Sequence, residues 1–113
     1  MKSILNILLF LISTSLAAQS YKDEISVVQF SAPFTKSAEI SLKKFNDHNT
    51  YKFCISENKK YFVDEDIVYL PTIILYHNGE EVVRVASGIS LKLPEDTIEK
   101  IEEAIEEIIE SKF

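Results

Sequence analysis

The sequence predicts an α/β domain in which the elements follow the order strand, helix, strand, short helix, hairpin, helix. Three observations support this prediction. Ile25–Phe30 is β-branched and apolar on both faces, Asn78-Gly79 separates two strand-like segments, and isoleucines recur at helical spacing near the C-terminus. A strand that is apolar on both faces is typical of a sheet covered on both sides. The chain of 113 residues has room for one such domain.

The first 18 residues have the pattern of an export signal. Lys2 supplies a positive start, an apolar run follows over Ile4–Ile12, and Ala17 and Ala18 occupy plausible cleavage positions. Cleavage would place the protein in the periplasm, in the cell envelope or outside the cell. The alternative is an uncleaved segment that anchors the chain in a membrane or lies buried within an assembly. Residues 19–24 then form a linker, and residues 25–113 form the domain.

The charge of the chain is acidic and unevenly distributed. The sequence has 18 acidic and 12 basic residues, and loss of Lys2 with the leader leaves 18 against 11, a net charge of −7. Glu95–Lys112 alone holds eight acidic and two basic residues. No basic cluster is available to follow a phosphate backbone, so we do not expect nucleic-acid binding.

The first predicted helix follows the first strand. Apolar residues from Thr35 onward fit a helix that ends near residues 46–49, with Lys43 and Lys44 in its last turns, where cations suit the helix dipole. Thr50–Ser56 then alternates apolar and polar side chains, as a strand does. Residues 58–67 are expected to form a short helix or turn.

The hairpin and the last helix complete the predicted order. Residues 71–77 and 80–86 read as strands, and Asn78-Gly79 tolerates the positive φ angles of the tight turn between them. The last helix is predicted to include Pro94 in its first turn. Its buried face carries Ile98, Ile101, Ile105 and Ile108, and glutamates fill its outer face.

Two motifs make the chain resemble the thioredoxin family over about residues 25–112. Ile67–Val82, IVYLPTIILYHNGEEV, is similar to the segment in which a cis-proline precedes a Thr-led strand and a hairpin. Val27–Phe34, VVQFSAPF, is similar to the strand and turn that lead into the redox helix. The resemblance implies a cis bond before Pro71 and a mixed four-stranded sheet of order 2-1-3-4 with helices on both faces. The N-terminal strand and helix of the full fold would be missing.

The resemblance also shows at which positions this chain differs from the family pattern. The two redox cysteines fall on Thr35 and Ala38, with Lys36 and Ser37 between them, and the buried acid of active members falls on Gln29. Disulfide exchange needs an attacking thiolate and a second thiol. We therefore expect no dithiol activity, and we expect Thr35 to cap the helix start by accepting a bond from a backbone N–H.

Several other residues are candidates for a reactive, metal-binding or partner-binding site. Cys54 is the single cysteine, and it is interpreted as a small buried hydrophobe or, alternatively, as a single reactive thiol. Asp64–Asp66 lacks the spacing of an EF-hand loop, and His48 and His77 are isolated, so neither a metal nor a cofactor is expected. The glutamate face of the last helix is either solvated or a surface for a basic partner.

The expected strand order leaves Thr50–Ser56 as a free edge that presents Thr50, Lys52 and Cys54. Lysine on an edge strand hinders pairing with other chains, and Lys52 can act in this way. The candidates for pairing with this edge are a partner chain, a second copy and the lead-in Gln19–Glu24.

Three functions follow from these observations. The first is a redox-inactive module that binds a protein or an extended peptide beside the cis-proline. By resemblance that site consists of Phe34, Thr35, Tyr69, Leu70, Pro71, Ser87 and Gly88. The second is a structural subunit of a virion or cell-envelope assembly that uses the free edge. The third is an enzyme that works through Cys54 alone.

Overall fold

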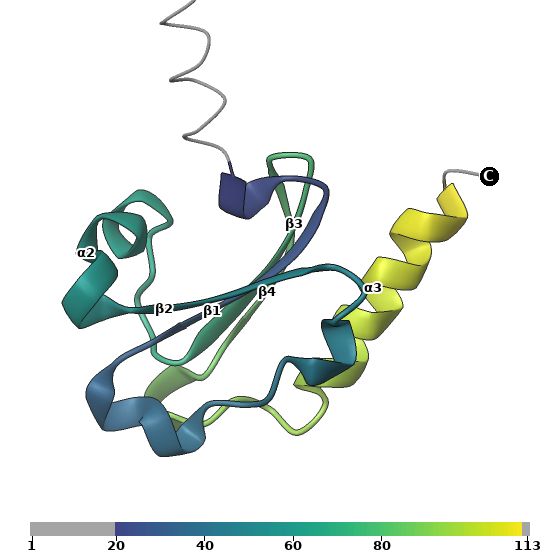
Figure 1. Ribbon diagram of the computed structural model, residues 1–113. Helices are drawn as coiled ribbons and strands as arrows, with labels where there is room; N and C mark the ends of the chain where they lie inside the picture. The colour runs from purple at the N-terminus through teal and green to yellow at the C-terminus, as the bar shows by residue number, and fades with distance from the viewer. Residues whose placement is uncertain (1–19, 112–113) are drawn as a thin grey trace, which may run out of the picture.

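The computed structural model describes residues 20–111 (Figure 1). Its strands and α-helices are β1 (Ile25–Ser31), β2 (Asn49–Cys54), α2 (Ile55–Asp64), β3 (Thr72–His77), β4 (Glu80–Ala86) and α3 (Thr97–Ser111). Four short 3₁₀ segments join them: η1 (Ser20–Lys22), η2 (Pro33–Ala38), η3 (Lys43–Phe45) and η4 (Gly88–Ser90). The predicted export signal lies outside the described residues. Within residues 20–111, no helix has the length and apolar character needed to span a membrane.

The four strands form one mixed sheet in the order β2-β1-β3-β4, as predicted. β1 runs parallel to β2 and antiparallel to β3, and β3 and β4 form an antiparallel hairpin. The register places Gln29 of β1 between Lys52 of β2 and Ile73 of β3. The hairpin turn is also confirmed, because Asn78 and Gly79 have φ angles of 50° and 92°.

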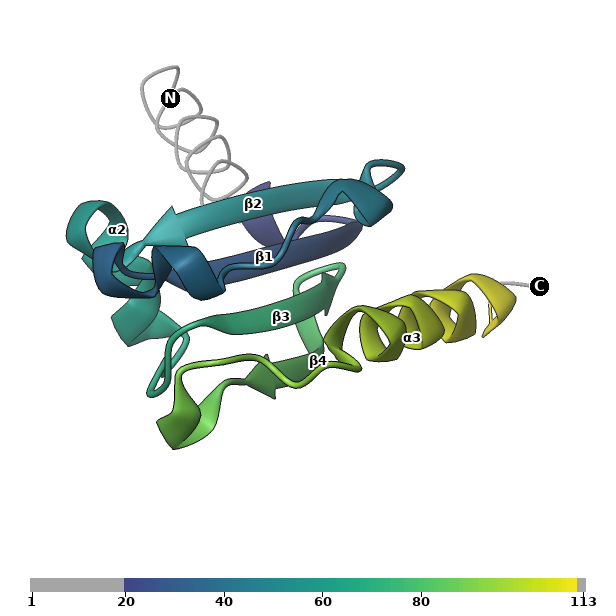
Figure 2. The same cartoon turned by 90° about the horizontal axis from the view of Figure 1, so that it is seen from below.

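Both faces of the sheet are covered, which explains why β1 is buried along its whole length (Figure 2). One core packs Val27 and Leu75 against the isoleucines of α3 and against Leu42 and Phe45 of the segment before β2. The other core packs the opposite face of β1 and β3 against α2 and the N-terminal segment. Its buried members are Tyr21, Val28, Phe30, Phe62, Ile74 and Tyr76.

Two predicted boundaries are wrong by a few residues. β2 ends at Cys54, so Ile55 and Ser56 begin α2 and do not continue the strand. α3 begins at Thr97 and does not include Pro94. The N–H and the hydroxyl of Thr97 both donate to the carbonyl of Pro94, at 3.2 and 2.6 Å, and these bonds fix the start of the helix.

The helix predicted from Thr35 to near residues 46–49 is also wrong, because the structure has the two short segments η2 and η3 joined by residues 39–42, which are not helical. Glu39 has φ −66° and ψ 147°, which is extended backbone. The cause is Gln29, whose side chain is fully buried. Its amide nitrogen donates to the Ile40 carbonyl at 2.9 Å, and its oxygen accepts the Ile40 N–H at 3.0 Å. Both backbone groups of Ile40 are thereby taken from the helical hydrogen-bond pattern.

The largely buried carboxylate of Glu65 holds the N-terminal segment to the domain. Glu65 accepts hydrogen bonds from the hydroxyls of Tyr21 and Tyr76, each at 2.8 Å, and pairs with the Lys22 ammonium at 2.8 Å. The Lys22 carbonyl in turn accepts the N–H of Gly79 in the hairpin turn. The described part of the lead-in therefore runs to the hairpin, and the expectation that it could pair with β2 is wrong.

Replacement of Gln29 by leucine should destabilise the domain by about 1–3 kcal/mol, because both backbone groups of Ile40 lose their partner. The free energy of unfolding is measured by urea denaturation, and hydrogen exchange follows the Ile40 amide. Val82→Ala, an exposed change on β4, serves as the control. Wild-type stability together with an Ile40 amide that stays protected would contradict this role for Gln29.

Stability should fall at acidic pH because of Glu65. Burial alone would raise the pKa of Glu65, but hydrogen bonds from Lys22, Tyr21 and Tyr76 outweigh it and lower this pKa below its ordinary value of 4.5. A lowered folded-state pKa gives stability that is present above pH 4.5 and is lost as the pH falls through the folded-state value.

This pH dependence is measured by urea denaturation from about pH 7 to about pH 3. Glu65→Gln should be less stable at neutral pH and should lose less stability on acidification than the wild type. Glu103→Gln, at an exposed position on α3, should keep the wild-type profile. The same acid-induced loss in Glu65→Gln as in the wild type would show that the Glu65 cluster does not cause it.

Candidate functional site

The predicted site residues gather at one end of the sheet, which we call the loop end. Here β1, β2 and β4 end and β3 begins: Ser31 lies beside Cys54, Phe30 beside Thr72, and Thr72 beside Ala86. The segments that leave these strands therefore lie at the same end, namely η2, the loop before β3 and η4 (Figures 1 and 2).

The loop end exposes large apolar side chains. Phe34 on η2 is 71% exposed, Val68 and Tyr69 before β3 are 79% and 44% exposed, and Ile89 on η4 is 91% exposed. Phe34 and Tyr69 were predicted site residues, whereas Val68 and Ile89 were missed. The only sequence signal for the latter two is an apolar residue within a loop. Exposed apolar side chains that gather on one surface are typical of an interaction site.

A buried polar framework supports these exposed residues. The Leu70–Pro71 peptide bond is cis. Ser87, which directly precedes η4, bonds to both residues of this cis peptide. Its N–H donates to the Pro71 carbonyl at 3.1 Å, and its hydroxyl donates to the Leu70 carbonyl at 2.9 Å. Gly88 follows with a φ of 71°, a conformation that favours glycine. Leu70, Pro71, Ser87 and Gly88 thus form the base of the loop end, and Pro71 and Ser87 are buried.

Thr35 is held inside η2 and is only 2% exposed. Its hydroxyl oxygen accepts the Ala32 N–H at 3.0 Å and donates to the Ala32 carbonyl at 3.1 Å. The hydroxyl therefore satisfies backbone groups at the start of η2, which is the kind of capping bond that the sequence predicts. Ala38, at the other position that the resemblance assigns to a redox cysteine, ends η2.

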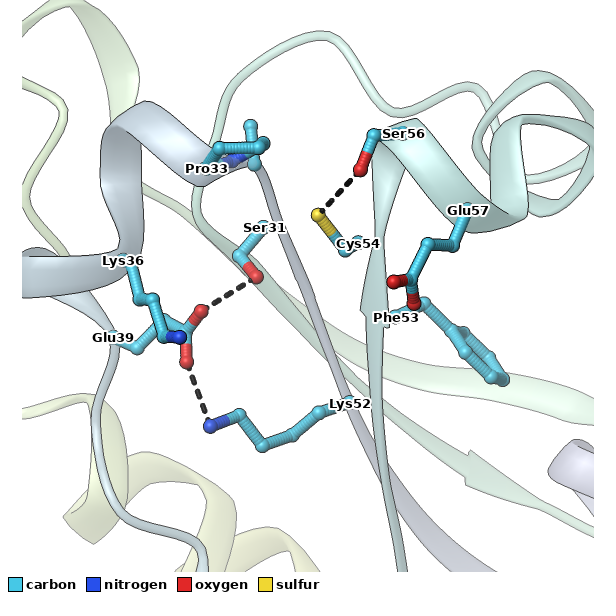
Figure 3. Close-up of a pocket in the computed structure, with 10 residues that line it drawn as sticks. Ser31, Pro33, Lys36, Glu39, Lys52, Phe53, Cys54, Ser56 and Glu57 are labelled. Carbon is cyan, nitrogen blue, oxygen red and sulfur yellow. Dashed lines mark hydrogen bonds and ion pairs between the residues drawn. The ribbon is translucent and has the colours of Figure 1, made fainter.

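A pocket of about 380 Å³ lies beside η2 at the same end of the sheet (Figure 3). It is lined by Ser31, Ala32, Pro33, Lys36, Glu39, Lys52, Phe53, Cys54, Ser56 and Glu57. The Cys54 sulfur lies 3.2 Å from the Ser56 hydroxyl oxygen, and the Cys54 side chain is half-buried. The interpretation of Cys54 as a buried small hydrophobe is therefore wrong, because the thiol borders a pocket open to solvent.

An ion pair crosses this pocket. One oxygen of Glu39 lies 2.7 Å from the Lys52 ammonium, and the other accepts the Ser31 hydroxyl at 2.8 Å (Figure 3). Burial alone would raise the pKa of Glu39, but the bonds from Lys52 and Ser31 outweigh it, so the pKa lies below its ordinary value. The extended backbone at Glu39, which Gln29 imposes, is what brings this carboxylate over β2.

The remaining candidate groups are dispersed. Within residues 20–111, no three histidine, cysteine or acidic side chains lie close enough together to hold a metal ion. His48 borders a polar surface pocket near Asp47, and His77 lies 3.2 Å from the Asn78 amide. Neither histidine is near the loop end.

Several solved structures with a similar backbone are thioredoxins. The thioredoxin of Malassezia sympodialis matches with a TM-score of 0.59 at 18% identity, covering 76% of this chain and 81% of that one. The chain has a thioredoxin-like fold. A mutant thioredoxin from Halobacterium salinarum matches with a TM-score of 0.57 at 21% identity, covering 80% of this chain and 83% of that one. The oxidised thioredoxin of Plasmodium falciparum matches with a TM-score of 0.55 at 19% identity, and the match covers 80% of this chain and 89% of that one.

The backbone similarity to these structures establishes the fold, whereas the low sequence identities leave the activity open. No model of a known protein family matches the chain, and no curated protein sequence matches it either. The activity must therefore be argued from the loop end itself.

The exposure of Cys54 gives a direct prediction. A thiol reagent should modify Cys54 completely in the folded protein, because the side chain is half-exposed at a pocket. Modification is followed by absorbance with and without denaturant, and Cys54→Ser provides the blank. Labelling that occurs only after denaturation would contradict the pocket geometry.

Proposed function

We propose that this chain is a redox-inactive, thioredoxin-like binding module that holds an extended protein segment at the loop end. The observation that carries the proposal is the group of exposed apolar side chains on three loops at one end of a rigid sheet. These are Phe34, Val68, Tyr69 and Ile89. Binding residues carried on loops and positioned by a rigid scaffold are a common arrangement.

The chemistry of the loop end supports binding over electron exchange. The sequence has one cysteine, Cys54, so it cannot form a disulfide within its 113 residues. By resemblance the redox positions are Thr35 and Ala38. The Thr35 hydroxyl is buried and fully engaged with the Ala32 backbone. It has neither the acidity nor the access that attack on a disulfide requires.

The partner is best described as an extended segment with apolar side chains. Tyr69 and Phe34 offer aromatic surface, and aromatic residues are enriched at the energetic centres of interfaces. The Leu70 carbonyl accepts one bond from Ser87, and a carbonyl oxygen has a second lone pair for a partner's backbone N–H. Extended segments bind through backbone bonds of this kind, with side chains setting specificity.

A second candidate function uses Cys54 as a single thiol. The observation that favours it is that Cys54 is only partly buried and lines the pocket of Figure 3. In this function the Cys54 thiolate attacks a disulfide of a partner, forms a mixed disulfide and releases one partner thiol. A second, external thiol would be needed to restore the free cysteine.

Substitutions at the loop end should weaken peptide binding. Peptides that bind the wild type are selected from an array of extended sequences with alternating apolar residues, and their affinities are measured by fluorescence anisotropy. Phe34→Asp and Tyr69→Asp should each weaken binding by about tenfold or more, because they put a charge into an apolar contact.

The matched control is Val82→Asp, which adds the same charge at an exposed apolar position on β4. Circular dichroism establishes that all three variants fold. If the loop-end variants and the β4 control bind the peptide with equal affinity, the loop end is not the binding site.

A further inference from the structure

We infer that β2 is a homotypic pairing edge: a second copy of this chain adds its own β2 antiparallel to this one and extends the sheet across a two-fold axis. This inference goes beyond peptide binding at the loop end and does not depend on it. It rests on the unequal character of the two sheet edges, on where the acidic charge lies and on the side-chain pattern of β2.

The two edges of the sheet differ in how they discourage pairing. β4 has an irregularity opposite Leu75 and Tyr76, and it carries the charged residues Glu80, Glu81 and Arg84. Bulges and charges of this kind hinder strand addition at an edge. β2 carries one charged side chain, Lys52, whose ammonium lies 2.7 Å from the Glu39 carboxylate. The charge on β2 is therefore neutralised within the same chain, and β2 is the edge better suited to pairing.

The distribution of acidic charge favours the same edge. The chain has a net charge of −6, so two copies repel each other in general. The glutamates are concentrated on α3, which packs against β4 at the opposite side of the sheet from β2 (Figure 2). Pairing through β2 keeps the two α3 helices at the outer ends of the doubled sheet, whereas pairing through β4 would bring them together.

The aromatic side chains of β2 favour one two-fold arrangement, with its axis at Lys52. Tyr51 and Phe53 lie on one face and stack with ring centroids 6.1 Å apart. A two-fold axis perpendicular to the sheet places equivalent residues of the two copies on the same face of the doubled sheet. An axis that passes through Lys52 sets Tyr51 opposite Phe53 of the partner subunit. The symmetry produces this aromatic pair twice, and directly opposed aromatic pairs stabilise antiparallel strands. An axis at Tyr51 would instead set Phe53 opposite Asn49 of the partner subunit. The axis at Lys52 also sets Lys52 opposite Lys52 of the partner subunit, and the repulsion is offset because each ammonium pairs with Glu39 of its own chain.

No other described segment covers this edge. Within residues 20–111, β2 pairs with β1 alone. The N-terminal segment contacts β2 through side chains, because Tyr21 lies edge-on to Phe53 with ring centroids 5.5 Å apart and the Asn49 amide donates to the Asp23 carbonyl at 3.2 Å. Its described residues form no strand pairing with β2. Among the described strands, the outer backbone edge of β2 is therefore left for a second copy.

The register makes a cross-linking test possible with the full chain. An axis at Lys52 places Thr50 opposite Cys54 of the partner subunit, so Thr50→Cys should form a disulfide-linked dimer under mild oxidation. Positions 50 and 54 of one chain are about 13 Å apart along a strand, which is too far for a disulfide within the chain. The control is Val82→Cys, an exposed position on β4. We expect Thr50→Cys to cross-link about tenfold faster or more.

Sedimentation of the reduced protein supplies an independent measurement. The wild type should be dimeric at about 100 µM, Thr50→Lys should weaken the dimer by about tenfold or more, and Val82→Lys should not. A wild type that is monomeric at this concentration would overturn the inference, and so would a Thr50→Cys variant that cross-links no faster than the β4 control.

Discussion

The structure depends on the buried amide of Gln29. This side chain lies in the central strand β1, where nothing of it is exposed, and it bonds both backbone groups of Ile40. A buried amide must satisfy its donors and acceptors within the protein, and pairing with a backbone amide does so. The pairing holds the backbone extended at Glu39, brings the Glu39 carboxylate to Ser31 and Lys52, and confines the segment after β1 to short 3₁₀ turns.

This constraint connects the fold to the proposed function. By resemblance, Gln29 and Thr35 stand where active thioredoxins have a buried acid and a redox cysteine. In this chain the Gln29 side chain forms hydrogen bonds with the backbone of Ile40, and the Thr35 side chain forms them with the backbone of Ala32. Both side chains therefore stabilise local backbone conformation. The surface around them presents Phe34, Tyr69 and other apolar groups to solvent. We propose that the positions of the reaction became structural supports and that the loop end remained available for binding.

The sequence was informative where local pattern determines structure. The strands and the Asn78-Gly79 turn follow from side-chain periodicity and turn chemistry, while the strand order required the family resemblance. The helix predicted from Thr35 does not form, because the Gln29 side chain takes the hydrogen bonds of the Ile40 backbone that a helix would need. Gln29 lies 11 residues from Ile40 in the sequence, and no local pattern reveals this interaction. Val68 and Ile89 were missed for a related reason. Whether an apolar loop residue is exposed depends on packing between segments distant in the sequence.

The most direct test of the account is the reduction of insulin disulfides by the pure protein, with dithiothreitol as the electron source and a thioredoxin with both cysteines as the positive control. The account predicts that the chain, with or without Cys54→Ser, reduces insulin no faster than dithiothreitol alone, because the positions that the resemblance assigns to the two redox cysteines hold Thr35 and Ala38, which carry no thiol. A rate clearly above this background that persists in Cys54→Ser would contradict the account.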